Sequence, residues 1–115
     1  IFVKSGIIIY MFDSFKCLRT FDKLRIRKNK GLFYRGSTYI EKENITKLKK
    51  IVSSWKELFN EASEEFILTG FFNEKLNEYE RTNYNKNEVM ESLENLITLC
   101  EKAEKENKII EHWGI

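Results

Sequence analysis

The chain has 115 residues, of which 42% are hydrophobic and 14% aromatic, and its net charge is +2. This length suits one domain with a modest core, and the composition argues against disorder. Nine Lys and Arg residues against two Asp residues give residues 1–40 a charge of +7, whereas residues 41–115 carry −5. Such a separation of charge favours a protein that binds a partner through the electrostatic field of one face.

The first residues are apolar and begin with Ile1 rather than methionine. Residues 7–12 could form a buried strand, or the natural start could be Met11, with the first ten residues as translated upstream sequence or an artefact; we slightly favour the second. The run is too short and interrupted to span a membrane, and it lacks the small-residue cleavage site of a signal peptide. We therefore divide the chain into residues 1–11, an N-terminal extension or edge strand, and residues 12–115, a single domain.

The basic N-terminal part has the period of β-strands. Residues 15–21 and residues 23–28 alternate in polarity, and residues 29–31 offer a turn because Gly31 can take a positive φ. Residues 32–40 are rich in aromatic and β-branched side chains and predict the return strand, with a bulge or bend at Gly36.

The period changes from 2 to 3.6 at Asn44, which is a plausible N-cap. The apolar stripe of this first helix comprises Ile45, Leu48, Ile51, Val52, Trp55, Leu58, Phe59 and Ala62. Residues 65–72 predict a largely buried central strand, and residues 73–84 are either its hairpin partner, which we prefer, or a short helical turn.

A second amphipathic helix follows, capped by Asn85 or Asn87 and ending near Asn107. Residues 109–115 are either a last short strand or a docked tail. This order of elements predicts an α+β fold: a mainly antiparallel sheet covered on one face by two amphipathic helices, a two-layer sandwich.

No catalytic, cofactor or metal motif stands out, so we assign no such residues. His112 is the only histidine and has no ligand-type neighbours at metal-site spacing. Cys17 and Cys100 lack a CxxC arrangement and are expected to be two buried thiols in a reducing compartment, which implies a cytoplasmic protein.

Two charged surfaces are candidates for partner binding. The basic one places Lys23, Arg25 and Arg27 on one strand face and adds Lys28, Arg35 and Tyr39. A basic and aromatic sheet face can bind single-stranded nucleic acid, but the ribonucleoprotein aromatic motif is absent, and an acidic protein surface is the preferred partner. The acidic candidates are Glu74, Glu78 and Glu80.

The layout resembles the small immunity proteins of bacterial polymorphic and contact-dependent toxin systems. The likeness covers residues 12–115: the entry from Gly36 into the first helix, Trp55-Lys56-Glu57-Leu58, the strand at 66–72, and the ending Ile109-Ile110-Glu111-His112-Trp113-Gly114-Ile115. It implies a protein without enzymatic activity that blocks one cognate toxin by covering its active site. Inhibitors of nucleases in this group tend to be acidic, so residues 74–80 could supply such a face.

We therefore expect a non-catalytic binding protein, most plausibly an immunity-type inhibitor that neutralises a cognate bacterial toxin by protein–protein contact. The alternative is a small nucleic-acid-binding or regulatory module that uses the basic ribbon of residues 23–35. No membrane association is expected, and a homodimer remains open.

Overall fold

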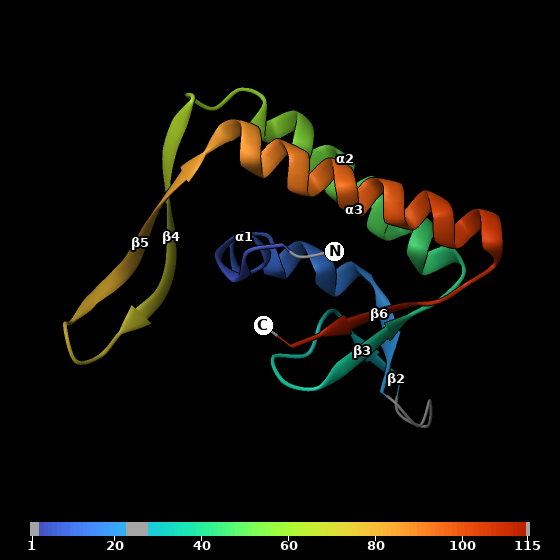
Figure 1. Cartoon of the computed structure of the whole chain (residues 1–115). Coiled ribbons are helices and arrows are strands. Elements are labelled where there is room, and N and C mark those ends of the chain that lie inside the picture. The colour runs from blue at the N-terminus through green and yellow to red at the C-terminus, as the bar shows by residue number, and fades with distance from the viewer. Residues whose placement is uncertain (1–2, 23–27, 115) are drawn as a thin grey trace.

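A computed structural model describes residues 3–22 and 28–114, and the fold is α+β, as expected (Figure 1). The elements are α1 (Ser5–Tyr10), the 3-10 helix η1 (Phe12–Cys17), β1 (Arg19–Phe21), β2 (Lys28–Lys30), β3 (Ser37–Ile40), α2 (Glu43–Phe59), β4 (Glu65–Asn73), β5 (Glu78–Asn85), α3 (Lys86–Glu106) and β6 (Ile110–Trp113). None of these helices has the length and apolar character that a membrane crossing needs.

The strands form two antiparallel sheets rather than one. A four-stranded sheet has the order β2-β1-β3-β6, and within the described part of the chain β4 and β5 pair only with each other. Figure 1 shows α2 and α3 side by side across the four-stranded sheet, with α1 and η1 between the layers and β4–β5 extending from the end of the helix pair. The expected two-layer arrangement is thus confirmed for the body of the molecule, and the second sheet is an addition to it.

The two long helices form where the apolar stripes predict them, except that Leu58 is exposed rather than buried and Ala62 lies beyond the end of α2 at Phe59. Ile45, Leu48 and Val52 of α2 and Leu93 and Cys100 of α3 are buried in the common core. The Asn85 side chain caps α3 by accepting a hydrogen bond from the backbone N–H of Glu88, and Asn107 ends it in the left-handed conformation. The hydrophobic faces, rather than intrinsic propensity, hold such helices in place.

The expected N-cap of α2 is wrong. The helix begins at Glu43, and the preceding residue, Lys42, has φ 48° and makes no side-chain cap. Asn44 is buried instead, and its Oδ1 accepts a hydrogen bond from the backbone N–H of Arg19, 3.0 Å away. This side chain therefore joins α2 to β1, where a buried amide needs a partner.

The N-terminal segment is helical, so the strand alternative for residues 7–12, the less favoured of the two, is wrong. Ile7 and Ile8 of α1 are buried together with Met11 in the main hydrophobic cluster. The strand expected over residues 15–21 is also mostly wrong. Residues 12–17 form η1, and only Arg19–Phe21 is extended. Cys17 is consequently exposed rather than buried, whereas Cys100 is buried as expected.

The basic ribbon pairs differently from the prediction. β2 returns along β1, with Thr20 opposite Asn29, so residues 29–31 are not the hairpin turn. Of residues 32–40, only Ser37–Ile40 is a strand; it follows a bend in which Gly36 has φ 76° and its carbonyl accepts the N–H of Gly114. The last strand, β6, pairs with β3, which confirms the strand alternative for the C-terminal segment.

The expected buried central strand is also wrong. β4 forms, but only Leu68 in it is buried, because the strand belongs to the two-stranded sheet outside the main body. Its hairpin partner β5 confirms the preferred alternative for residues 73–84. The turn between them is held by Asn73, whose Oδ1 accepts hydrogen bonds from the N–H groups of Lys75 and Leu76.

Candidate functional site

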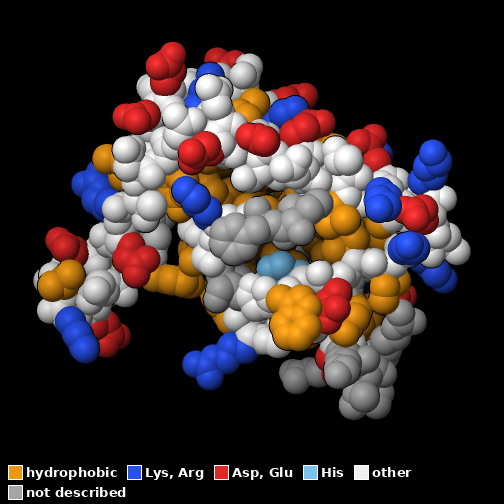
Figure 2. Space-filling model, in the orientation of Figure 1, with side chains coloured by type: hydrophobic (Ala, Val, Ile, Leu, Met, Phe, Trp, Pro, Cys, Tyr) orange, Lys and Arg blue, Asp and Glu red, His pale blue; other side chains and the backbone are white. Residues whose placement is uncertain are grey.

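The most distinctive surface is the hairpin of β4 and β5, which we call the arm (residues 65–85). Figure 2 shows it on the left, with its far end standing clear of the rest of the molecule. Two-stranded hairpins are only marginally stable in water by themselves, so the stability of the arm depends on how its base is anchored to the body. The side chains that the arm exposes determine what it can bind.

Buried aromatic packing anchors the base of the arm. Phe66 stacks on Phe59 of α2 with ring centroids 5.5 Å apart, and the Tyr84 ring lies 6.2 Å from Phe66. Tyr84 is almost fully buried, and a backbone hydrogen bond of 2.7 Å from Lys86 to Glu64 closes the base. These contacts fix the direction in which the arm leaves the helix pair.

A β-bulge lies in the middle of the arm. The register runs from Thr69 opposite Arg81 to Phe72 opposite Tyr79, so Gly70 and Phe71 together face the single residue Glu80. A bulge shifts the alternation of side chains by one residue. Phe72 therefore shares a face with Ile67 and Tyr79.

This outer face is open to solvent and carries several apolar side chains, with Thr69 and Arg81 between Ile67 and Phe72. The side chains of Ile67, Phe72 and Tyr79 are 56%, 46% and 59% exposed, and Leu76 at the tip is 65% exposed. The Phe72 and Tyr79 rings meet edge to face, with centroids 5.1 Å apart. We call these four residues the arm strip; several exposed apolar side chains on one hairpin mark an interaction site more often than a single exposed one does.

The inner side of the arm meets the body at one aromatic contact. Phe71 lies 6.2 Å from Tyr34, measured between ring centroids, and Tyr34 in turn stacks on Phe12 at 4.7 Å. The bulge therefore sends Phe71 toward the body and leaves Phe72 in the arm strip. Aromatic pairs at these separations are attractive beyond the area that they bury.

All three acidic candidates lie on the arm. Glu74, Glu78 and Glu80 are exposed, and Glu74 stands in the tip turn. The arm contains four glutamates against Lys75 and Arg81, so its charge is negative. By the register, Glu78 and Glu80 lie on the opposite face of the hairpin from Phe72 and Tyr79. Apolar side chains with charged residues around them have the layout of a protein interface, in which the centre is apolar and the rim charged.

The basic candidates are not gathered into one surface by the described residues. Lys23, Arg25 and Arg27 lie outside them, and only the backbone of Lys28 is described, paired with Phe21 in β2. Arg35 is exposed in the loop before β3, and the Tyr39 hydroxyl donates a hydrogen bond of 3.0 Å to Glu111 Oε1. Arg35 and Tyr39 thus belong to the four-stranded sheet and not to the arm.

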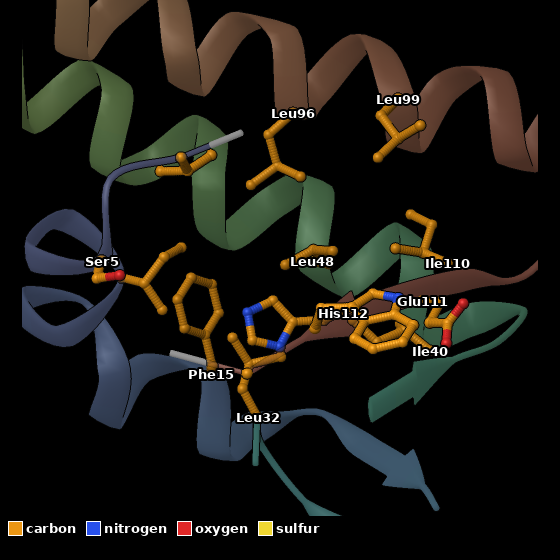
Figure 3. Close-up of a pocket in the computed structure, with 14 residues that line it drawn as sticks. Ser5, Phe15, Leu32, Ile40, Leu48, Leu96, Leu99, Ile110, Glu111 and His112 are labelled. Carbon is orange, nitrogen blue, oxygen red and sulfur yellow. The ribbon is translucent and has the colours of Figure 1, made fainter. Parts of the chain in front are cut away.

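A second feature, which the sequence did not suggest, is a cavity of about 520 Å³ between the helix pair and the four-stranded sheet (Figure 3). Its apolar lining includes Phe15, Leu32, Ile40, Leu48, Leu96, Leu99 and Ile110. The cavity is partly open to solvent, so water can enter it when no other molecule is bound.

His112 is the polar group inside the cavity. Figure 3 shows its imidazole pointing into the space beside Phe15 and Leu48. Its Nδ1 is buried and has no hydrogen-bond partner in the described part of the chain. Burial lowers the pKa of His112 below its usual 6.5, so the ring is neutral at pH 7.

The described residues offer no metal centre, and the buried thiol of Cys100 is unreactive. No group of three or more His, Cys, Asp or Glu side chains within ranges 3–22 and 28–114 could hold an ion. Burial raises the pKa of the Cys100 thiol to about 11, which keeps it protonated and inert. From the sequence alone, Leu48 belongs to the apolar stripe of the first helix, and His112 comes into question only as a metal ligand. A lone histidine in the C-terminal strand was the one signal of the cavity in the sequence.

We compared the chain with protein-family models, with curated proteins and with solved structures, and none of the three comparisons finds a match.

Proposed function

We propose that this protein is a non-catalytic binding protein that recognises another protein through the arm. The observation that carries the proposal is the arm strip: Ile67, Phe72, Leu76 and Tyr79 are exposed on a hairpin whose base is anchored by buried aromatic rings. An anchored arm loses little conformational freedom when it binds, which favours affinity.

The chemistry of the arm indicates the chemistry of its partner. The arm strip needs an apolar depression, and the glutamates of the arm need a basic rim. Phe72 and Tyr79 are the residue types that dominate binding energy when they are fully desolvated. Among residues 3–22 and 28–114, β4 and β5 are each paired on one side only, so a strand of the partner could also extend this sheet.

Within this class, we favour an immunity-type inhibitor that neutralises a cognate bacterial toxin in the cytoplasm. Two observations support this choice: the resemblance in layout described above, and the acidic, projecting tip formed by Glu74 and Glu78. A narrow acidic arm can enter a basic active-site cleft and exclude its substrate. The homodimer and the nucleic-acid module are the competing outcomes of the test.

Paired variants test this function. The double substitution Ile67→Ser and Phe72→Ser removes the centre of the arm strip, and Leu58→Ser with Ile109→Ser removes equally exposed apolar groups outside the arm. Tagged proteins would be used to capture partners from the source cell, and the captured protein would be purified and titrated with each variant. We expect a one-to-one complex that the arm variant weakens at least about a hundredfold and the control variant leaves unchanged.

The competing outcomes are distinct in the same experiment. Capture of nucleic acid that is lost as salt rises, and that is abolished by reversing Lys23, Arg25 and Arg27 to Glu, would replace the proposal with the basic-ribbon module. Equal binding by the arm variant and the control variant would reject the arm as the contact surface. A concentration-dependent increase in mass of the free protein, abolished by the arm variant, would assign the arm to a homodimer.

A further inference from the structure

The cavity beneath α2 and α3 is not used by the arm, and it carries a proposal of its own. Its volume, about 520 Å³, falls within the range of sites that hold small molecules. Such sites are mostly apolar and have few, well-placed polar groups. The cavity is partly open to the surface, so it communicates with solvent.

The polar chemistry inside selects the ligand. Nδ1 of His112 is buried and lacks a partner among the described residues, so a bound molecule that supplies one recovers a hydrogen bond that the protein does not make. A neutral imidazole has one donor and one acceptor nitrogen, and a hydroxyl group can pair with either because it both donates and accepts. A ketone or an ether can only accept.

The charges at the cavity disfavour an anionic ligand. The described lining residues include no Lys or Arg, and the carboxylate of Glu111 is exposed and accepts a hydrogen bond from the Tyr39 hydroxyl. Burial lowers the pKa of His112, so the imidazole supplies no positive charge at neutral pH. A carboxylate or a phosphate would therefore enter an apolar space without a counter-charge, which is costly.

We propose that this cavity binds a neutral, mainly apolar small molecule that carries one hydroxyl group, and that the imidazole of His112 is the hydrogen-bond partner of that hydroxyl. The apolar body of the ligand packs between the leucines of the helix pair, such as Leu48 and Leu96, and the sheet residues Ile40 and Ile110. This inference is independent of the arm and of the protein partner.

Three probes of one shape test the selectivity. Para-pentylphenol carries the hydroxyl, pentylbenzene lacks it, and para-pentylbenzoate replaces it with a charge. We expect the phenol to bind about fivefold more tightly than the hydrocarbon, which is the contribution of one ordinary hydrogen bond, and the benzoate to bind more weakly than both. Because His112 is the only histidine, its imidazole nitrogen signals in the NMR spectrum of the full chain need no assignment.

The phenol should move these nitrogen signals in a saturable manner, whereas the hydrocarbon should bind with little effect on them. His112→Phe should abolish the preference for the phenol, and the control Ser5→Ala, which changes another polar wall residue, should preserve it. If His112→Phe does not fold, the NMR titration of the unsubstituted protein alone tests whether the phenol binds at His112. Absence of saturable binding by any probe, or tighter binding of the benzoate, would overturn the proposal.

Discussion

The contact between α1 and the arm can be tested by a substitution at Gly6 whose effect on the free energy of unfolding changes sign when Tyr84 is also substituted. A Cβ atom added at Gly6 would lie 1.9 Å from Tyr84 Oη and 3.2 Å from Tyr84 Cζ. Tyr84 is buried, and its ring is rigid, so the hydroxyl cannot simply move aside. Overpacking of this kind costs about 1–3 kcal/mol.

Gly6 lies within α1, where alanine is intrinsically better than glycine by about 1 kcal/mol. We therefore expect Gly6→Ala to lower the free energy of unfolding by about 0–2 kcal/mol. In a Tyr84→Phe background the atom at 1.9 Å is gone, and the same substitution should become neutral or stabilising by up to about 1 kcal/mol.

Urea unfolding of the four proteins of this double-mutant cycle measures the coupling between the two sites. The structure predicts a coupling energy of about 1–3 kcal/mol, equal to the clash that Tyr84→Phe removes. If Gly6→Ala has the same effect in both backgrounds, the two sites are independent, and the docking of α1 against the base of the arm is refuted.

Four further predictions concern the body of the molecule. Leu93 is fully buried, so Leu93→Ala should destabilise the protein by about 3–5 kcal/mol in urea unfolding, whereas Leu58→Ala on the exposed face of α2 should stay within about 0.5 kcal/mol; similar losses for both would contradict the core. Lys42 has φ 48° and ψ −122°, a backbone conformation that favours glycine. Lys42→Gly should therefore stabilise the protein by about 1 kcal/mol and raise Tm by about 4 °C, and a lower Tm would contradict this backbone conformation. Burial lowers the pKa of His112, so as pH falls below 6.5 the unfolded chain binds this proton before the folded protein does, and the free energy of unfolding should decrease. His112→Gln should flatten this pH dependence. An unchanged slope in that variant would show that groups other than His112 cause the pH dependence. Cys17 is exposed, and the pKa of buried Cys100 is raised to about 11, so a thiol reagent should modify Cys17 at once and Cys100 only after denaturation; rapid reaction of both would contradict the burial of Cys100.

The long helices could be predicted because their determinants are local. Asn85 and Asn107 delimit α3 through capping chemistry that is written in the sequence, and the stripe from Ile45 to Phe59 repeats at the helical period. Asn44 was misassigned because a buried asparagine and a capping asparagine look alike in sequence; only the partner, the N–H of Arg19, distinguishes them.

The strands were harder to predict, because pairing depends on residues far apart in the chain. The run from Phe66 to Phe72 has the apolar character of a buried strand. Its outer face is nevertheless in solvent, because the strand carries a bulge after Thr69 and no further strand of the described residues lies beside β4. Over η1, the alternation of Phe15 and Cys17 suggested a strand, although Phe12, Phe15 and Leu18 are spaced by three residues, as a 3-10 helix requires.

The candidate sites divide in the same way. Glu74, Glu78 and Glu80 could be named from sequence because exposed acidic residues around a turn stay together in any hairpin. The cavity could not be predicted, because it is the space that remains when α2, α3 and the four-stranded sheet fail to meet, and no local pattern encodes such a space.

The most direct test of the central claim is hydrogen–deuterium exchange of the free protein and of its purified complex with the captured partner protein. The arm account predicts that binding slows exchange over residues 65–85, with the largest change between Ile67 and Tyr79, and leaves β2 and β3 unchanged. Protection confined to the four-stranded sheet, with the arm exchanging as in the free protein, would contradict the claim that this hairpin is the surface by which the protein acts.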